Sequence, residues 1–208
     1  TLLMDIHVSG DAIPGKEIGI HVVDTERGPR FFFDADDGVH GREMWVSDGT
    51  SIGTTMLGDM ETADAIDWTT EFTPWMDGAV FTTHGQQGHR MWWTNGSVTT
   101  SIWQAPWFSS STSSDLVNQS LTLSSLGQGL LQGDENGLWF AGKEASAGLE
   151  MIYLSAIGEL HIFDLQPFGD SSPSQGLSLE DGFVVAASDG TGRQLAKLDH
   201  DGGYTWLT

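Results

Sequence analysis

The chain has 208 residues and no cysteine, and its 29 acidic residues against 8 basic ones give a formal net charge of −21. Without cysteine, thiol catalysis, zinc–thiolate sites and disulfide bonds are excluded. The strong negative charge opposes binding to nucleic acid and to anionic membrane surfaces, and no apolar run approaches the roughly 18 residues needed to cross a bilayer. We therefore expect no nucleic-acid partner and no membrane insertion.

Four segments of the sequence resemble one another. Each begins with a turn glycine, continues as an apolar strand and reaches a second glycine, and the turn glycines are Gly28, Gly78, Gly137 and Gly182. Three positions after the second glycine stands an apolar residue: Met44, Met91, Met151 and Leu195. A recurrence of this kind indicates a repeated structural unit.

Within each segment, alternating apolar residues and Asp-Gly or Asn-Gly pairs are typical of strands joined by hairpins. A further strand is expected ahead of each segment, at 19–24, 71–76, 121–126 and 176–179. Each unit then holds about four antiparallel strands, and the expected units are approximately 7–60, 61–105, 106–165 and 166–208. Residues 1–6 resemble the last strands of the units and are expected to form the outer strand of a preceding or closing blade.

Units of this length with four strands fit the blades of a β-propeller better than a sandwich, because a sandwich gives no reason for turn glycines at fixed offsets. The predicted fold is therefore all-β, a propeller of about four four-stranded blades that is either a closed ring or part of a larger one. Met44, Met91, Met151 and Leu195 are expected to have equivalent surroundings in it.

Two stretches resemble known repeats. "FFFDADDGVHGREMWVSDGTSIGTTMLGDM", from Phe31 to Met60, is similar to the ELWxxDGT-repeat family, with Met44 in place of the usual leucine. "DHDGGYTW", from Asp199 to Trp206, resembles the Asp-box hairpin of sialidase-like propellers. Both resemblances imply a β-propeller, and the first implies an exported or cell-surface protein. Neither implies a defined reaction.

The acidic residues of the first segment allow two interpretations. Asp34, Asp36, Asp37 and Asp48 offer the hard oxygen ligands that calcium prefers in a loop rich in Asp and Gly. Alternatively, short acidic side chains in such turns accept hydrogen bonds from their own backbone. Turn-forming roles are expected for one set of residues in particular: Asp48, Gly49, Asp201, Gly203, Thr205 and Trp206.

The stretch "SIWQAPWFSSSTSSD" interrupts the repeat spacing after Ser101. Its aromatic residues Trp103, Trp107 and Phe108 are candidates for stacking on sugar rings or for anchoring a partner protein. Insertions on one face of a repeat fold often carry the binding surface.

Catalytic constellations are sparse. Arg42, Arg90 and Arg193 follow the second glycine of three units, which suggests a sialidase-like arginine cluster, and Tyr153 or Tyr204 would then have to serve as nucleophile. The leading hypothesis is a non-enzymatic, exported or cell-surface propeller module for adhesion or assembly. It would bind a protein or glycan partner, including other copies or neighbouring subunits of a larger assembly. The alternatives are a sialidase-like glycan-processing enzyme and a calcium-stabilised structural subunit.

Overall fold

The computed structural model of the chain describes residues 2–60, 72–85, 88–102, 122–123, 130–144 and 147–207. Over these ranges the chain forms β-strands and turns, and no α-helix is found among them. The chain divides into two compact units, Thr1–Ile102 and Trp103–Thr208. The all-β prediction is confirmed.

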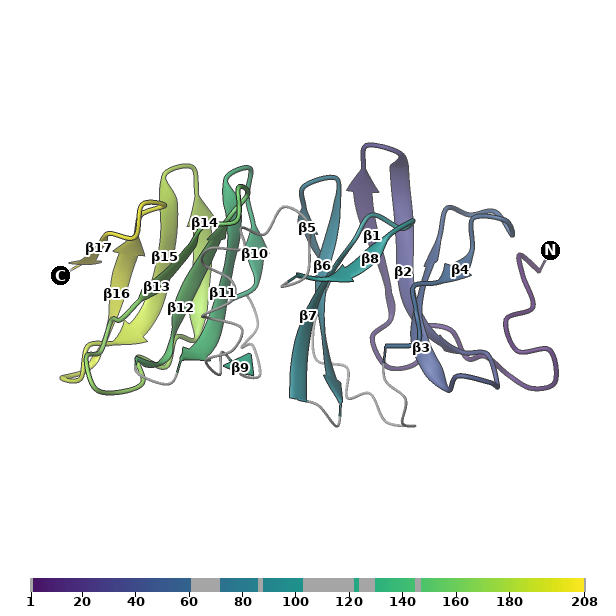
Figure 1. Ribbon diagram of the computed structural model, residues 1–208, viewed down its shortest axis with the longest axis horizontal. Helices are drawn as coiled ribbons and strands as arrows, with labels where there is room; N and C mark the ends of the chain where they lie inside the picture. Colours follow the sequence, from purple (N-terminus) through teal and green to yellow (C-terminus); the bar gives the residue numbers. More distant parts are fainter. Residues whose placement is uncertain are drawn as a thin grey trace. The chain divides into compact units, whose positions relative to one another are not determined.

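The first unit contains two antiparallel sheets, each a simple meander (Figure 1). The first sheet consists of β1 (Ile20–Thr25), β2 (Gly28–Asp36), β3 (Arg42–Ser47) and β4 (Thr55–Met56) in that order. The second consists of β5 (Thr73–Trp75), β6 (Gly78–Gly85), β7 (Gly88–Thr94) and β8 (Thr99–Ser101).

The second unit also contains two antiparallel sheets (Figure 1). The first has β10 (Gln132–Gly133), β11 (Gly137–Glu144), β12 (Gly148–Ser155) and β13 (Leu160–Phe163) in order, with β9 (Thr122–Leu123) added beside β11. The last sheet has β14 (Gln175–Leu179), β15 (Gly182–Ser188), β16 (Arg193–Leu198) and β17 (Tyr204–Leu207). Every sheet thus lies inside one of the four expected repeat units.

The strand expected ahead of the third segment differs in detail. Two short strands share the edge of β11, with Leu123 opposite Gly142 and Gln132 opposite Trp139. The strand expected at 121–126 contains β9, whereas β10, with the sequence Gln-Gly, has no apolar residue that could show an alternation.

The outer strand expected at residues 1–6 does not form over the described residues 2–6. A strand needs a partner edge for its hydrogen bonds, whereas Leu2, Leu3 and Met4 are exposed, and the chain first packs on the face of the first sheet at Ile6. Ile6 and Ala12 pack against Phe33 and Trp45, which are only 7% and 6% exposed. The start of the chain therefore covers one face of β1–β4.

The two sheets of the first unit pack face to face over a shared core. Phe32 and Met44 of β2 and β3 belong to the same buried cluster as Phe81 of β6. Phe72, just ahead of β5, stacks on Phe32 with ring centroids 4.6 Å apart and contributes to this cluster. Aromatic and aliphatic burial of this kind is the main source of stability for the pair of sheets.

The second unit repeats this arrangement. Met151 and Tyr153 of β12 share a buried cluster with Phe183 and Val185 of β15. Trp139 of β11 lies within it, with its ring centroid 5.2 Å from that of Phe183. The same strand position, three residues after the second glycine, thus supplies a core methionine in both units.

The fourth residue at this position departs from the expected equivalence. Met44, Met91 and Met151 are completely buried, whereas Leu195 is 49% exposed. Ala196, its neighbour in β16, faces the shared core, so Leu195 points to the opposite side of the sheet. On that side nothing among the described residues covers it, so the prediction of equivalent surroundings is wrong for Leu195.

A buried glutamate stands two residues after the second glycine in the first and third of the four repeat segments. Glu43 accepts a hydrogen bond from the backbone N–H of Met60 at 3.3 Å. Glu150 accepts hydrogen bonds from the N–H groups of Leu165 at 3.1 Å and Ser171 at 3.0 Å. In both repeat units the glutamate side chain accepts hydrogen bonds from the segment that leads from one sheet to the next, so this glutamate is a structural fastener.

Candidate functional site

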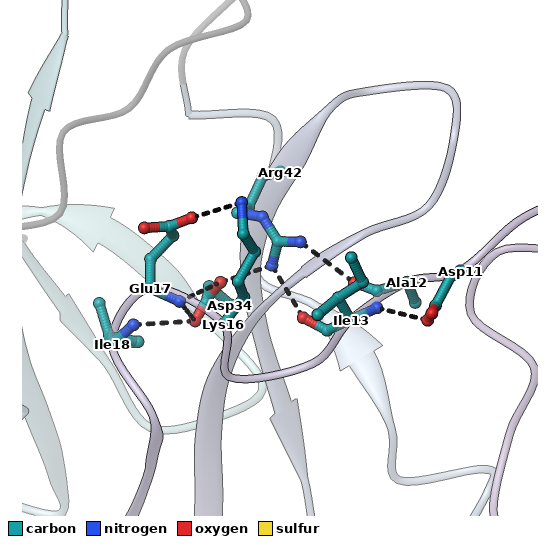
Figure 2. A network of polar contacts seen from close by, with 8 residues as sticks. All are labelled: Asp11, Ala12, Ile13, Lys16, Glu17, Ile18, Asp34 and Arg42. Carbon is teal, nitrogen blue, oxygen red and sulfur yellow. Dashed lines mark hydrogen bonds and ion pairs between the residues drawn. The ribbon is translucent and has the colours of Figure 1, made fainter.

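Asp34, the first candidate calcium ligand, lies at the centre of a polar network inside the first unit (Figure 2). Its side chain is fully buried and forms an ion pair with Arg42. It also accepts hydrogen bonds from the N–H groups of Glu17 at 3.2 Å and Ile18 at 3.1 Å. Arg42 in turn donates to the carbonyl of Ile13 at 3.0 Å. The pair ties the start of the chain to the first sheet.

Asp36 and Asp37 serve the turn between β2 and β3. Asp36 accepts a hydrogen bond from the N–H of Gly38 at 2.7 Å, and Asp37 accepts from those of Val39 and His40, both at 2.8 Å. Desolvation raises the pKa of Asp37, but these bonds and the His40 ring, 2.7 Å away, outweigh it and lower the pKa to about 2. The Asp37 carboxylate is therefore already satisfied by its own turn.

Asp48 is a turn fastener in the sequence Ser-Asp-Gly-Thr. Its carboxylate accepts hydrogen bonds from the N–H of Thr50 at 2.9 Å and from the Thr50 hydroxyl at 2.7 Å. These bonds hold the pKa of Asp48 below its usual value. Asp189 makes the same pair of bonds to Thr191, both at 2.8 Å. The tetrapeptide thus folds alike after β3 and after β15, two different hairpins of the repeat.

The four candidate calcium ligands therefore do not act together. Among the residues that the structure describes, no group of three or more His, Asp or Glu side chains could hold a metal ion. All four carboxylates instead accept hydrogen bonds from nearby backbone N–H groups, and the carboxylate of Asp34 also forms an ion pair with Arg42. The calcium-stabilised interpretation stays a prediction that this geometry does not favour.

The Asp-box-like hairpin joins β16 to β17. Asp201 accepts a hydrogen bond from the N–H of Gly203 at 3.2 Å, and Trp206 packs against the buried cluster of the second unit. Thr205 is exposed on β17. The aspartate closes its own turn and the tryptophan is a packing residue, in line with the turn-forming and packing roles expected of them.

Two further groups of candidates were expected from the sequence. Trp103, Trp107 and Phe108 lie outside the described residues. Arg193 donates a hydrogen bond to the carbonyl of Ser172 at 2.8 Å. Arg193 is the first residue of β16 and Leu198 the last, so Arg193 lies about 17 Å along the strand from the end that leads into the Asp-box-like hairpin.

An open hollow of about 350 Å³ lies in the second unit, where three turns meet. Glu135 and Asn136 come from the turn between β10 and β11, Ala156 and Ile157 from the turn after β12, and His200 from the Asp-box-like hairpin. The N–H of Ala156 donates to the carbonyl of Asn136 at 2.7 Å, which joins the first two turns. The hollow is lined by Glu135, Asn136, Tyr153, Ser155, Ala156, Ile157 and His200.

Asp134 organises the hydrogen bonds beside the hollow. It accepts from the indole N–H of Trp139 at 2.9 Å and from the hydroxyl of Ser178 at 3.2 Å, and it lies 3.4 Å from Nε2 of His200. Burial raises the pKa of Asp134, but the bonds from Trp139, from its own turn and from His200 lower it overall. The carboxylate stays ionised and holds the imidazole of His200 in place.

Tyr153 is the aromatic floor of the hollow and lies against Trp139 and His200, with ring centroids 4.3 Å and 5.1 Å away. Burial, and secondarily the charge of Asp134, raise the pKa of Tyr153 well above its usual value. The phenol therefore stays protonated, and its side chain is fully buried. A nucleophilic tyrosine needs the opposite shift and access to substrate, so Tyr153 does not suit that role in the sialidase-like alternative.

The sequence did not point to this hollow. The sequence separates Asp134 from Tyr153 by 19 positions and Tyr153 from His200 by 47. Each of them, taken alone, is explained as an ordinary turn or strand residue. The only available signal was the Asp-box resemblance, because the hairpin that it marks carries His200.

No protein-family model, no curated protein and no solved structure matches the chain. Over the described ranges, no helix is long and apolar enough to cross a membrane.

Proposed function

We propose that the chain is a non-enzymatic propeller module of an exported or cell-surface protein, and that it binds a glycan partner in the hollow of the second unit. Its four antiparallel sheets of consecutive strands are what propeller blades require. The observation that carries the binding role is the convergence of three turns around Tyr153 and His200.

The lining suits a sugar. The partly exposed His200 offers an aromatic ring that rests on the buried Tyr153, and Glu135, Asn136 and Ser155 offer the carboxylate, amide and hydroxyl groups that hydrogen-bond to sugar hydroxyls. Glu135 and Asn136 are exposed and so are accessible to a ligand. Such a combination of an apolar platform with a few polar groups is typical of small-ligand sites.

The charge of the hollow narrows the class of sugar. No lysine or arginine lines it, whereas Glu135 does and the ionised Asp134 lies just behind it. An anionic sugar such as a sialylated glycan would therefore meet repulsion. The proposed ligands are neutral or amine-bearing oligosaccharides.

The test is calorimetric titration of the chain with three sets of oligosaccharides: neutral, amine-bearing and sialylated. Binding is expected for the first two sets only. Glu135→Ala and Asn136→Ala are expected to weaken it at least fivefold, because each removes one hydrogen-bonding group from the rim.

The matched control is Glu159→Ala. This carboxylate is exposed on the turn between β12 and β13, next to the hollow but outside its lining. Its loss is expected to leave binding unchanged. Equal binding of sialylated and neutral sugars, or equal losses in Glu135→Ala and Glu159→Ala, would overturn the proposal.

A further inference from the structure

Two asparagines of the chain are directly followed by glycine, and both stand in turns. Asn95–Gly96 lies in the turn between β7 and β8, and Asn136–Gly137 leads from the turn after β10 into β11. In an Asn-Gly pair the backbone nitrogen of the glycine can approach the side-chain carbonyl carbon of the asparagine, because glycine has no Cβ in the way. Such a pair can lose its side-chain amide without an enzyme.

The reaction needs only water. The glycine nitrogen forms a bond to the side-chain carbonyl carbon and gives up its proton, while the side-chain amide nitrogen takes that proton and leaves as ammonia. The product is a five-membered cyclic imide. One water molecule then opens the ring at either of its two carbonyl groups, which leaves an aspartate or an isoaspartate. In both products a neutral amide has become a carboxylate.

The turn that holds Asn95 places hydrogen-bond donors on the reacting carbonyl group. The side-chain oxygen Oδ1 of Asn95 accepts hydrogen bonds from the backbone N–H groups of Ser97 and Val98, both at 3.0 Å. Negative charge develops on this oxygen as the ring closes. Because hydrogen bonds to a charged oxygen are stronger than those to a neutral one, these donors stabilise the transition state more than the starting amide.

The attacking nitrogen of Gly96 is held only by a neutral group. Its N–H donates to the hydroxyl of Thr94 at 3.1 Å, and a hydroxyl can rotate away at little cost. Gly96 has a φ of 82° at the tip of the hairpin, and Ser97 beside it is exposed. The turn is therefore open to the water that the second step consumes.

Asn136 carries the same dipeptide in a different setting. The peptide group between Asn136 and Gly137 is held on both sides, because its carbonyl accepts from the N–H of Ala156 at 2.7 Å and its N–H donates to Asp134 at 2.8 Å. The Asp134 carboxylate is ionised, so this is a strong, charge-assisted bond that must break before the nitrogen can attack. A Cβ added at Gly137 would collide with the ring of Tyr153, which shows how closely this glycine is packed.

Exposure alone predicts the opposite order of reactivity. The side chain of Asn136 is exposed, whereas that of Asn95 is half-buried. The hydrogen bonds around the two peptide groups, and not access to solvent, therefore distinguish the two sites.

We propose that Asn95 is a site of spontaneous deamidation in the folded protein and that Asn136 is protected from it. The aspartate product keeps the turn, because Asp189 accepts the same pair of backbone hydrogen bonds, from Thr191 and Gly192. The isoaspartate product adds a methylene group to the backbone, so it disturbs the bond from the N–H of Asn95 to the carbonyl of Val98.

The new charge would lie beside a cation. Arg27 donates a hydrogen bond to the hydroxyl of Ser97 at 3.0 Å, so its guanidinium already reaches the turn. A carboxylate at residue 95 is therefore added where a positive charge offsets it, although the chain as a whole has a net charge of −21.

The test is incubation of the folded chain at mildly alkaline pH, followed by chymotryptic digestion and mass spectrometry. Trp103, Trp107 and Phe108 lie between the two asparagines, so each asparagine is measured in its own peptide. Conversion is expected to be about tenfold or more faster at Asn95 than at Asn136. The same chain unfolded in urea is the matched control, because without the fixed hydrogen bonds the two identical dipeptides are expected to react at similar rates.

Asn95→Asp supplies the authentic aspartate product, so that aspartate and isoaspartate can be told apart by their elution. Three outcomes would overturn the proposal: no conversion of Asn95 in the folded chain, equal rates at the two sites in the folded chain, or a faster reaction of Asn95 in urea than in the folded chain. The last result would mean that the turn protects Asn95. None of these outcomes bears on sugar binding in the hollow, which is measured separately.

Discussion

Glu150 connects the burial of one carboxyl group to the pH dependence of stability. Glu150 belongs to β12, and its side chain is fully buried. Desolvation raises its pKa from 4.5 to about 7 despite the hydrogen bonds from Ser171 and Leu165. The folded chain thus keeps Glu150 protonated at pH values where the unfolded chain has already released the proton. Unfolding between pH 4.5 and about 7 therefore releases a proton, and the free energy of unfolding falls as pH rises through that range.

The size of the effect follows from the two pKa values. A difference between 4.5 and about 7 corresponds to up to about 3 kcal/mol, at roughly 1.4 kcal/mol for each pH unit. This stability is fully present below pH 4.5 and is lost as pH approaches 7. Glu150→Gln carries no ionisable proton, so its contribution is expected to stay constant over the same range.

The assay is denaturant unfolding of wild type and Glu150→Gln at pH 5, 6, 7 and 8, followed by tryptophan fluorescence. The difference in unfolding free energy between the two proteins is expected to shift in favour of the variant by up to about 3 kcal/mol from pH 5 to pH 8. Glu159→Gln, which changes an exposed carboxylate on the next turn, is expected to track the wild type. Parallel pH profiles for wild type and Glu150→Gln would refute the reasoning.

Three further outcomes are expected. Asp34→Ala leaves Arg42 without its buried partner and is expected to cost about 3 kcal/mol in urea unfolding, whereas a loss below 1 kcal/mol would show that the pair is not a structural anchor. Asp48→Ala removes the two hydrogen bonds from Thr50, whereas Asp189→Ala removes those from Thr191 together with those from Gly192 and Gln194, so Asp189→Ala is expected to lower the urea midpoint of unfolding more than Asp48→Ala, and an equal or smaller shift would contradict this reasoning. Millimolar calcium is expected to leave the melting temperature unchanged, and a rise of several degrees would restore the calcium-stabilised interpretation.

The local structure of this chain could be predicted from its sequence because short-range hydrogen bonds define it. Alternating apolar residues and turn glycines predicted the strands and the meander of each sheet. The turn role of Asp48 was likewise predictable, since both of its bonds reach only two residues along the chain. In such features the interacting groups are adjacent in the sequence, so the pattern itself contains the contact.

Contacts between distant residues depended on the tertiary structure. Asp34 belongs to an acidic run that suggested calcium, yet its partner is Arg42 together with backbone groups 16 and 17 residues upstream. Tyr153 and His200 meet only because their sheets pack over one core. Leu195 holds the same repeat position as the three methionines, but only the packing of the sheets decides that their side chains are buried and that of Leu195 is exposed. Periodicity determines which side chains share a face, and only packing determines whether that face is buried, paired or left to solvent.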